Sequence, residues 1–439
     1  MQPTYQTQEE RAALLSEAGF ITTEAESDSW PHTNGKNRPI NHWQNTEWLC
    51  GRMGTNFRYN EMTKRTESSL EEYRNLSQDS IITDLRGRCA EHGYTLGKNE
   101  MADHISRIAE KNKYNPVRDY LDECLHLWDG KSRIRDLFQM FTLDIGAGQD
   151  PSFLLNLFEK WLITAVLLQC NKGTDAAQGV LVLVGAQGIG KTRLLYKLLP
   201  DPSWGTTGTM IDLRNKDTVM QALGYWIVEL GEYGRNIKAE KLDNYKAFIT
   251  NATDEFRAPY SRGSERHPRT TTFYASADTN TFLKDDAGER RNWTISIVGV
   301  EDVAVDMGQL WGEVAHLALV EKRPHWLNQQ EIAQLNLQNE LYKSRSSEYL
   351  IIYEALDWTA PWHDWVRMTA GELCKVLGMN DGRLRQIGKA LAQMQPLGVV
   401  LDTDTARRKY TMPPPRDKWA LAQMKQVVTD WELASGIKH

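Results

Sequence analysis

The sequence is poor in cysteine, and its five cysteines lie far apart: Cys50, Cys89, Cys124, Cys170 and Cys374. Zinc sites and disulfide frameworks need closely or regularly spaced cysteines. An odd and scattered set excludes both as the feature that organises the fold. It predicts reduced thiols in a cytoplasmic protein.

Long hydrophobic runs are also missing. The most apolar stretch, residues 161–170, has about half the length of a bilayer-spanning helix and follows Glu159 and Lys160 directly. We expect it to be a buried core helix. The first residues, MQPTYQTQEERAALLSEAG, lack the basic start and apolar centre of a signal peptide. These features predict a cytoplasmic protein with no membrane partner.

Positive charge is not in excess. The formal net charge is -6 over 439 residues, so no overall cationic surface attracts nucleic acid. Any such binding must come from local patches. A content of 41% hydrophobic and 25% charged residues is typical of globular proteins, and the length predicts two to four domains.

Three regions differ in pattern. Residues 1–150 alternate helical patterns with turns, which predicts a mainly helical N-terminal or collar region. Residues 151–345 hold a long apolar helix and then short, fully apolar runs, typical of parallel strands buried on both faces. Residues 346–439 form a smaller unit that ends in a helical tail. We expect an α/β fold with a P-loop core and a parallel sheet.

The stretch LVLVGAQGIGKTRLLYKLL, residues 181–199, matches the phosphate-binding pattern G-x-x-x-x-G-K-[ST] without a gap. Glycines let the backbone turn its N–H groups toward phosphate, and a helix beginning after the loop directs its positive end there. Lysine reaches the β and γ oxygens, and the threonine hydroxyl can ligate Mg²⁺. A tight turn without ligand is disfavoured because an apolar strand precedes the loop and a helical pattern follows. We expect ATP and Mg²⁺ to be bound by Gly185, Gln187, Gly188, Gly190, Lys191, Thr192 and Arg193.

Two carboxylates follow about 40 residues later, in YWIVELGEYG. A P-loop NTPase needs an acidic residue at the end of a neighbouring strand to hold Mg²⁺ and its water. We favour Glu229, at the strand end, for the metal and Glu232, in the turn, for the attacking water. The order of these roles stays open, as does the alternative that Glu232 is only solvated.

Polar and basic residues flank the next two expected strands. TTTFYASADTNTFL ends in Asp278 and Asn280, either of which can sense the γ-phosphate. Arg290 and Arg291 stand just before the following strand. Paired arginines there suit an arginine finger that reaches across a subunit boundary. The alternative is two surface arginines.

A basic segment lies between the acidic strand and the polar strand. Residues 257–269 contain four arginines and one glutamate, hence a formal +3, with an aromatic residue among them. Such a hairpin fits a contact with the backbone of single-stranded DNA. A solvated or inter-subunit loop is the alternative. The candidate DNA contacts are Arg257, Tyr260, Arg262, Arg266 and Arg269.

The C-terminal unit shows the order helix, turn, helix, hairpin, which is the outline of a winged helix. In DNA-binding versions the second helix enters the major groove, whereas other winged helices bind protein, and both options stay open. Basic residues gather on the second helix and near the hairpin: Arg383, Arg385, Lys389, Arg407, Arg408 and Lys409.

Five segments together resemble the virulence-associated protein E family, which consists of relatives of superfamily 3 helicases within the AAA+ class. They are GAQGIGKT, WIVELGE, FRAPYSRGSERHPR, FLKDDAGERRNW and NKYNPVRDYLDECLHLWDGKSRI, and the resemblance spans roughly residues 41–297. It implies a AAA+ ATPase that forms rings, commonly hexamers, and acts in replication of mobile elements. It also implies a Walker A motif from Gly185 to Thr192, a Walker B residue at Glu229 with Glu232 beside it, and a functional Arg290/Arg291 pair.

The chain departs from the family pattern at two places. Ala277 and Asp278 stand where the family usually has a threonine–asparagine pair, and Asn292 displaces an aromatic residue, with Trp293 following. Many relatives carry a primase domain ahead of the helicase, and about 150 residues are too few for one. We therefore expect the helicase half alone, with a separate primase or host replication proteins as partners.

These observations favour an ATP-dependent DNA helicase or translocase that works on single-stranded or forked DNA during replication of a phage, prophage or satellite element. The main alternative is an origin-binding initiator, or an ATP-driven assembly switch without processive unwinding. A small-molecule P-loop kinase is a third hypothesis. The basic hairpin and the C-terminal unit argue against it.

Overall fold

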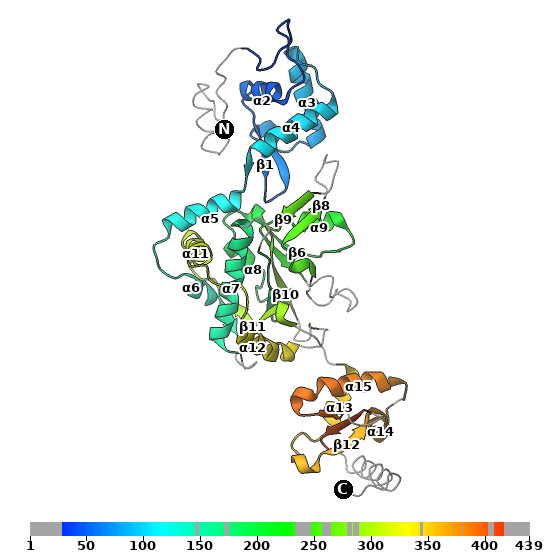
Figure 1. Ribbon diagram of the computed structural model, residues 1–439. Helices are drawn as coiled ribbons and strands as arrows, with labels where there is room; N and C mark the ends of the chain where they lie inside the picture. Colours follow the sequence, from blue (N-terminus) through cyan, green and yellow to red (C-terminus); the bar gives the residue numbers. More distant parts are fainter. Residues whose placement is uncertain are drawn as a thin grey trace. The chain divides into compact units, whose positions relative to one another are not determined.

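The computed structural model divides the chain into two units (Figure 1). Unit 1 consists of Met1–Thr279 and Arg290–Gln338, and unit 2 of Asn280–Glu289 and Asn339–His439. The structure describes residues 29–144, 149–170, 175–231, 233, 247–256, 265–278, 283, 289–342, 346–379, 381–402 and 408–416.

Unit 1 begins with an N-terminal subdomain of helices around a small sheet. Its elements are α2 (Trp43–Arg52), β1 (Phe57–Asn60), β2 (Arg65–Ser68), α3 (Gln78–Glu91), α4 (Lys98–Lys111) and β3 (Lys113–Tyr114). Strand β1 pairs antiparallel with β2 and parallel with β3. The subdomain has its own apolar core, formed by side chains of the helices and of β1.

A capped helix leads from this subdomain into the core of unit 1. The side chain of Asn115 accepts hydrogen bonds from the N–H groups of Val117 and Arg118, both at 3.1 Å, and so begins α5 (Pro116–Leu127). Proline is favourable at the first helical position because its missing N–H would have no partner there. Helix α5 packs on α11 (Met307–Ala315).

The core of unit 1 is built on a six-stranded sheet in the order β4-β11-β5-β10-β7-β6. The strands are β4 (Phe141–Leu143), β5 (Val180–Val184), β6 (Gly205–Thr209), β7 (Ile227–Leu230), β10 (Thr272–Ala277) and β11 (Asn292–Val300). Only β4 is antiparallel to its neighbour within this sheet. Every residue of β5 and β7 is buried, which confirms the prediction of parallel strands covered on both faces.

Helices cover this sheet. The longest, α7 (Pro151–Cys170), packs against β5, β10 and β11. Its length and composition would suit a membrane span, but 72% of its apolar window is buried inside the protein. The prediction of a buried core helix is therefore confirmed. The other helices of the core are α6 (Ile134–Phe138), α8 (Arg193–Leu198), α9 (Lys216–Ala222) and α12 (Gln329–Asn339).

An antiparallel hairpin stands between β7 and β10 in the chain. It consists of β8 (Thr253–Phe256) and β9 (Glu265–Pro268), with Phe256 opposite Glu265. This confirms that the basic segment belongs to a hairpin. Its tip, residues 257–264, lies outside the described residues.

Unit 2 has its own apolar core and a three-stranded antiparallel sheet in which β14 lies between β12 and β13. Its elements are α13 (Ser347–Ala355), β12 (Val366–Thr369), α14 (Ala370–Val376), α15 (Leu384–Gln393), β13 (Val400–Asp402) and β14 (Lys409–Met412). The predicted order of helix, helix and hairpin is confirmed. The turn of the hairpin, residues 403–407, and residues 417–439 lie outside the described part.

Candidate nucleotide-binding site

Three glycines shape the loop between β5 and α8. A Cβ atom on Gly185 would lie 2.3 Å from the carbonyl oxygen of Ile297 on β11, so only glycine fits there. Gly188 and Gly190 have φ angles of +85° and +98°, which glycine adopts without strain. The N–H of Gly185 donates to the carbonyl oxygen of Ala277 on β10 at 3.1 Å. The loop is thus tied to both strands that flank β5.

Lys191 lies folded over this loop. Its Nζ donates to the carbonyl oxygens of Gly185 at 2.7 Å and Ala186 at 2.9 Å, and to Asp278 Oδ1 at 2.9 Å. The lysine is 7% exposed and the side chain of Asp278 25% exposed, so this ion pair is largely shielded from water. The sequence-predicted lysine and the predicted sensor carboxylate are therefore in direct contact.

Thr192 and Glu229 form the second polar pair of the site. The hydroxyl of Thr192 donates to Glu229 Oε1 at 3.2 Å, and Glu229 is 2% exposed. Glu229 lies within β7, which continues to Leu230, rather than at the strand end that we predicted. A hydroxyl and a carboxylate at this separation are oxygen donors of the kind that Mg²⁺ prefers.

Strand order explains why these four side chains meet. Strand β10 lies between the phosphate-loop strand β5 and the acidic strand β7, and all three are parallel. Asp278 directly follows β10, so it stands at the same sheet edge as the loop that follows β5. We call this edge, where the parallel strands end, the carboxyl edge. Gln187, Gly188 and Arg193 are exposed beside it.

Sequence reasoning missed Tyr274 as a neighbour of the acidic residue. Tyr274 pairs in register with Glu229 across β10 and β7 and is fully buried. Burial, and then the Glu229 carboxylate, raise the pKa of the Tyr274 phenol. The sequence shows a tyrosine in the β10 segment, but only the strand order shows that this tyrosine lies beside Glu229.

The arginine pair lies at the opposite edge of the sheet. Strand β11 begins at Asn292, which pairs with Val180 at the start of β5, whereas the phosphate loop follows the other end of β5. Arg290 and Arg291 directly precede β11, so they lie at what we call the amino edge. The length of β5, about 13 Å at about 3.3 Å per residue, separates the two. Arg290 is exposed, and neither arginine has an ion pair with a residue that the structure describes.

The predicted DNA contacts fall into three groups. Arg266, on β9, is exposed. Arg269 is 1% exposed, and its guanidinium forms a bidentate ion pair with Asp254, so its prediction as a DNA contact is wrong. Charge alone could not reveal the buried carboxylate opposite it. Arg257, Tyr260 and Arg262 lie outside the described residues, as do Glu232 and Asn280.

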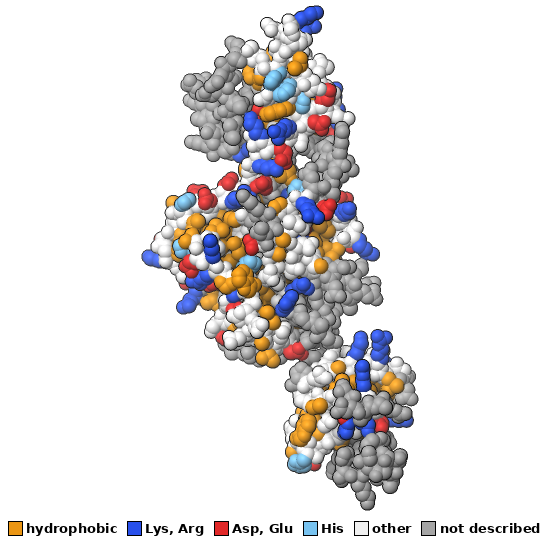
Figure 2. Space-filling view, in the orientation of Figure 1, with side chains coloured by type: hydrophobic (Ala, Val, Ile, Leu, Met, Phe, Trp, Pro, Cys, Tyr) orange, Lys and Arg blue, Asp and Glu red, His pale blue; other side chains and the backbone are white. Residues whose placement is uncertain are grey.

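The basic residues of unit 2 also fall into exposed residues and residues that are paired or buried. Arg385 and Lys389 are exposed on α15, where Figure 2 shows Lys and Arg side chains gathered. Arg383 pairs with Glu348 at 3.1 Å. Lys409 is 8% exposed at the start of β14, so it is not a surface cation as its sequence position indicated.

The loop, its lysine and the buried carboxylate on β7, one strand beyond β10, define a P-loop NTPase domain, which implies a nucleotide ligand. A model of the virulence-associated protein E-like domain matches residues 121–344, about half of the chain. The chain belongs to this family, which confirms the resemblance identified from the motifs. The match begins later and ends later than the stretch that those motifs indicated.

Three solved structures of the NrS-1 C-terminal region in its apo form are similar to the chain. They share 13%, 13% and 14% identity with it, with TM-scores of 0.37, 0.36 and 0.38. Each covers 84% of this chain, and the chain covers 99%, 99% and 98% of theirs. TM-scores of this size do not by themselves establish a common fold. No curated protein matches the sequence.

Proposed function

We propose that the chain is an ATP-dependent DNA helicase or translocase of superfamily 3 type, within the AAA+ class, that acts in replication of a phage, prophage or satellite element. One observation carries the proposal. Lys191, Thr192, Glu229 and Asp278 converge at the carboxyl edge, while the arginines stand at the amino edge, beyond reach of their own chain's phosphate loop. Membership of a virulence-associated protein E-like family supports a replication-associated NTPase.

Each residue of the carboxyl edge has a role in this proposal. Lys191 exchanges its carbonyl partners for the β and γ oxygens of ATP. Thr192 and Glu229 hold Mg²⁺, which neutralises charge on the phosphates when bound. Asp278 senses the γ-phosphate through its contact with Lys191. Glu232 orients the attacking water.

The arginines complete the site of a neighbouring subunit. An arginine finger stabilises charge on the transferring phosphoryl group. Because Arg290 and Arg291 precede β11, they serve a phosphate loop only if another copy of the chain brings one to the amino edge. This arrangement supports a homo-oligomeric ring as part of the proposal, and the family resemblance favours a hexamer.

DNA is the substrate in this account. Arg266 on the hairpin, with Arg257, Tyr260 and Arg262 beside it in sequence, would contact single-stranded or forked DNA. The winged-helix-like unit 2 would add Arg385 and Lys389 of α15. A separate primase and host replication proteins in the bacterial cytoplasm are the proposed partners.

The test is ATP hydrolysis with and without single-stranded DNA, followed by strand displacement on a forked substrate. We expect DNA to raise the rate and the wild type to displace the strand, whereas Lys191→Ala does neither. Hydrolysis that DNA does not change, with no displacement, would contradict the motor.

An origin-binding initiator is the second candidate, because unit 2 presents exposed cations on the helix that would enter a major groove. Footprinting on the element's own origin separates the two functions. Sequence-specific protection without strand displacement favours the initiator. Displacement without such protection favours the motor.

A further inference from the structure

A wide cleft lies within unit 1, between the N-terminal subdomain and the core. Strands β1 and β2 and helix α4 form one side. The start of α5, the end of α7 and strand β9 form the other. Its volume is about 2100 Å³. Pockets for small molecules measure roughly 300–1,000 Å³. The cleft therefore suits an extended ligand better than a compact one.

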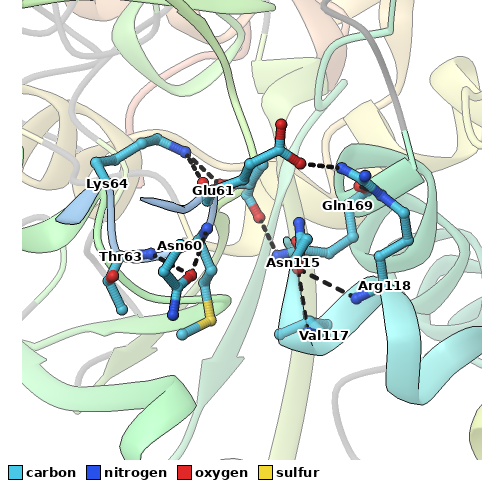
Figure 3. Close-up of polar contacts among 10 residues, drawn as sticks. Asn60, Glu61, Thr63, Lys64, Asn115, Val117, Arg118 and Gln169 are labelled. Carbon is cyan, nitrogen blue, oxygen red and sulfur yellow. Dashed lines mark hydrogen bonds and ion pairs between the residues drawn. The ribbon is translucent and has the colours of Figure 1, made fainter. Parts of the chain in front are cut away.

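Polar contacts fix the two sides of the cleft to each other. Lys64, in the turn between β1 and β2, donates across the cleft to Thr270 Oγ1 at 3.0 Å. On the core side, Gln169 of α7 holds Thr270 in place by donating to its carbonyl oxygen at 2.7 Å. Arg118 of α5 pairs with Glu61 of the same turn at 2.9 Å (Figure 3). Lys64 and Gln169 are buried. These interlocked contacts give the cleft a defined shape.

Cations outnumber carboxylates in the cleft, although the chain as a whole is acidic. Seven Lys and Arg residues line it against six Asp and Glu residues, while the chain carries a net charge of -6. Glu110 is paired with Lys113 at 2.6 Å. Arg65 on β2 and Arg266 on β9 are exposed, and neither has an ion pair within the described part of the chain. One unpaired arginine thus stands on each side.

Aromatic rings lie among these cations. The guanidinium carbon of Arg58 is 3.7 Å from the ring centre of Tyr114, and Lys113 Nζ is 5.7 Å from that of Tyr59. All four residues line the cleft. Figure 2 shows Lys and Arg side chains, with acidic ones between them, on the part of the subdomain that borders the core. Proteins that bind single strands combine cations, which contact the phosphates, with aromatic rings on which the unpaired bases stack.

We propose that the cleft binds a single strand of nucleic acid, with Arg65 and Arg266 on its phosphates and the tyrosines beside its bases. The proposal rests on the proposed function and gives the N-terminal subdomain a place in it. Arg266 belongs both to the cleft and to strand β9 of the hairpin, so the two surfaces share this arginine. Four further carboxylates, Glu67, Asp103, Asp119 and Asp201, keep the cleft from being uniformly basic. Because arginine–phosphate contacts release counterions from the strand, we expect binding to weaken as salt rises.

The experiment measures binding of a labelled 20-nucleotide oligo-dT to the full-length protein by fluorescence anisotropy, over a series of salt concentrations. The variants are Arg65→Glu and Arg266→Glu. The matched control is Arg135→Glu, at an exposed position of α6 outside the cleft. We expect each cleft variant to bind about tenfold more weakly than the control at low salt. The double variant should lower the salt slope by about 1.4, because each phosphate contact contributes about 0.7.

Two outcomes overturn the cleft. In the first, Arg65→Glu and the control bind with equal affinity and equal salt slope. In the second, duplex of the same length competes better than the single strand. ATP hydrolysis measured in the same samples separates this proposal from the motor. If DNA stimulates the wild type while Arg65→Glu binds normally, the cleft fails and the motor stands. If binding depends on Arg65 but DNA leaves hydrolysis unchanged, the cleft stands and the motor fails.

Discussion

The two edges of the central sheet arrange their charged side chains in opposite ways. At the carboxyl edge, Lys191 is buried against Asp278 and Glu229 is buried with the Thr192 hydroxyl on its oxygen. At the amino edge, Arg290 is exposed and has no ion pair with a described residue. One edge holds its charges in fixed pairs, and the other presents them to solvent.

This difference separates chemistry from contact. Groups that stabilise charge in a reaction are most effective when their positions are fixed in advance and shielded from water. Groups that contact another molecule must be exposed, and their charges must not be paired within their own chain. Strands β5 and β11 are parallel, so a single chain cannot bring its own arginines to its own phosphate loop. The comparison therefore predicts that ATP binding requires the carboxyl edge alone, whereas ATP hydrolysis requires both edges.

The largest expected effect is at the carboxyl edge. Lys191→Ala should reduce ATP hydrolysis about 100-fold or more, because the phosphate charge loses its fixed cation and Asp278 loses its partner. Lys197→Ala, on helix α8 directly after the loop, is the control. Lys197 is 27% exposed and pairs with Asp302 at the surface. ATP hydrolysis by Lys197→Ala should therefore stay within about twofold of the wild-type rate. Equal losses of ATP hydrolysis in the two variants would contradict a special role for the buried Lys191–Asp278 pair.

The next effect concerns stability beside the amino edge. Asp254→Asn leaves the buried Arg269 without its counter-charge, which should lower the free energy of unfolding by about 3–5 kcal/mol. Arg266→Ala, two strand positions from the base of the same hairpin, should change it by less than about 0.5 kcal/mol because this side chain is exposed. Urea unfolding measures both. Equal costs would mean that the ion pair does not hold the hairpin.

A smaller effect is expected where the phosphate loop meets β11. Gly185→Ala places a Cβ atom against the Ile297 carbonyl oxygen and should cost about 1–3 kcal/mol of stability. Gly87→Ala is the contrast. Beyond the backbone of α3 itself, no atom lies within 4 Å of a Cβ at Gly87, so this change should gain up to about 1 kcal/mol. Thermal unfolding measures both variants, and equal melting temperatures would contradict the expected cost of the close approach at Gly185.

The smallest effect is a pH dependence at the contact between the subdomain and the core. Burial lowers the pKa of Lys64 to about 8, against roughly 10.4 in an unfolded chain. Between these values the unfolded chain binds a proton that the folded chain does not, so wild-type stability rises with pH across this window. Lys64→Met lacks this gain. The melting temperature of the wild type should therefore rise relative to that of Lys64→Met from pH 8 to pH 10, and a constant difference would refute the shift.

Local motifs were predictable because contiguous residues determine them. The phosphate loop needs only the spacing of Gly185, Lys191 and Thr192, and the apolar runs of β5, β10 and β11 identify buried strands by composition. The family resemblance was equally available from short segments. Strand β6 was not predicted, because its sequence GTTGT has neither an apolar run nor a clear alternation.

Relations between distant residues were not predictable from one sequence. Asp278 meets Lys191 across 87 positions only because β10 lies next to β5. The burial of Arg269 depends on Asp254 facing it across a hairpin, which composition does not show. The opposite placement of the arginines and the phosphate loop also follows from strand direction rather than from any motif.

The most direct test of the account mixes two inactive variants, Lys191→Ala and Arg290→Ala/Arg291→Ala, and measures ATP hydrolysis. Loss of an arginine finger costs about 10³-fold or more. We predict that the mixture recovers part of the wild-type rate, since some interfaces then pair an intact phosphate loop with intact arginines. Mixing Lys191→Ala with Glu229→Gln should recover nothing, because both changes affect the same edge. No recovery in the first mixture, or wild-type hydrolysis by the arginine variant alone, would contradict the shared site.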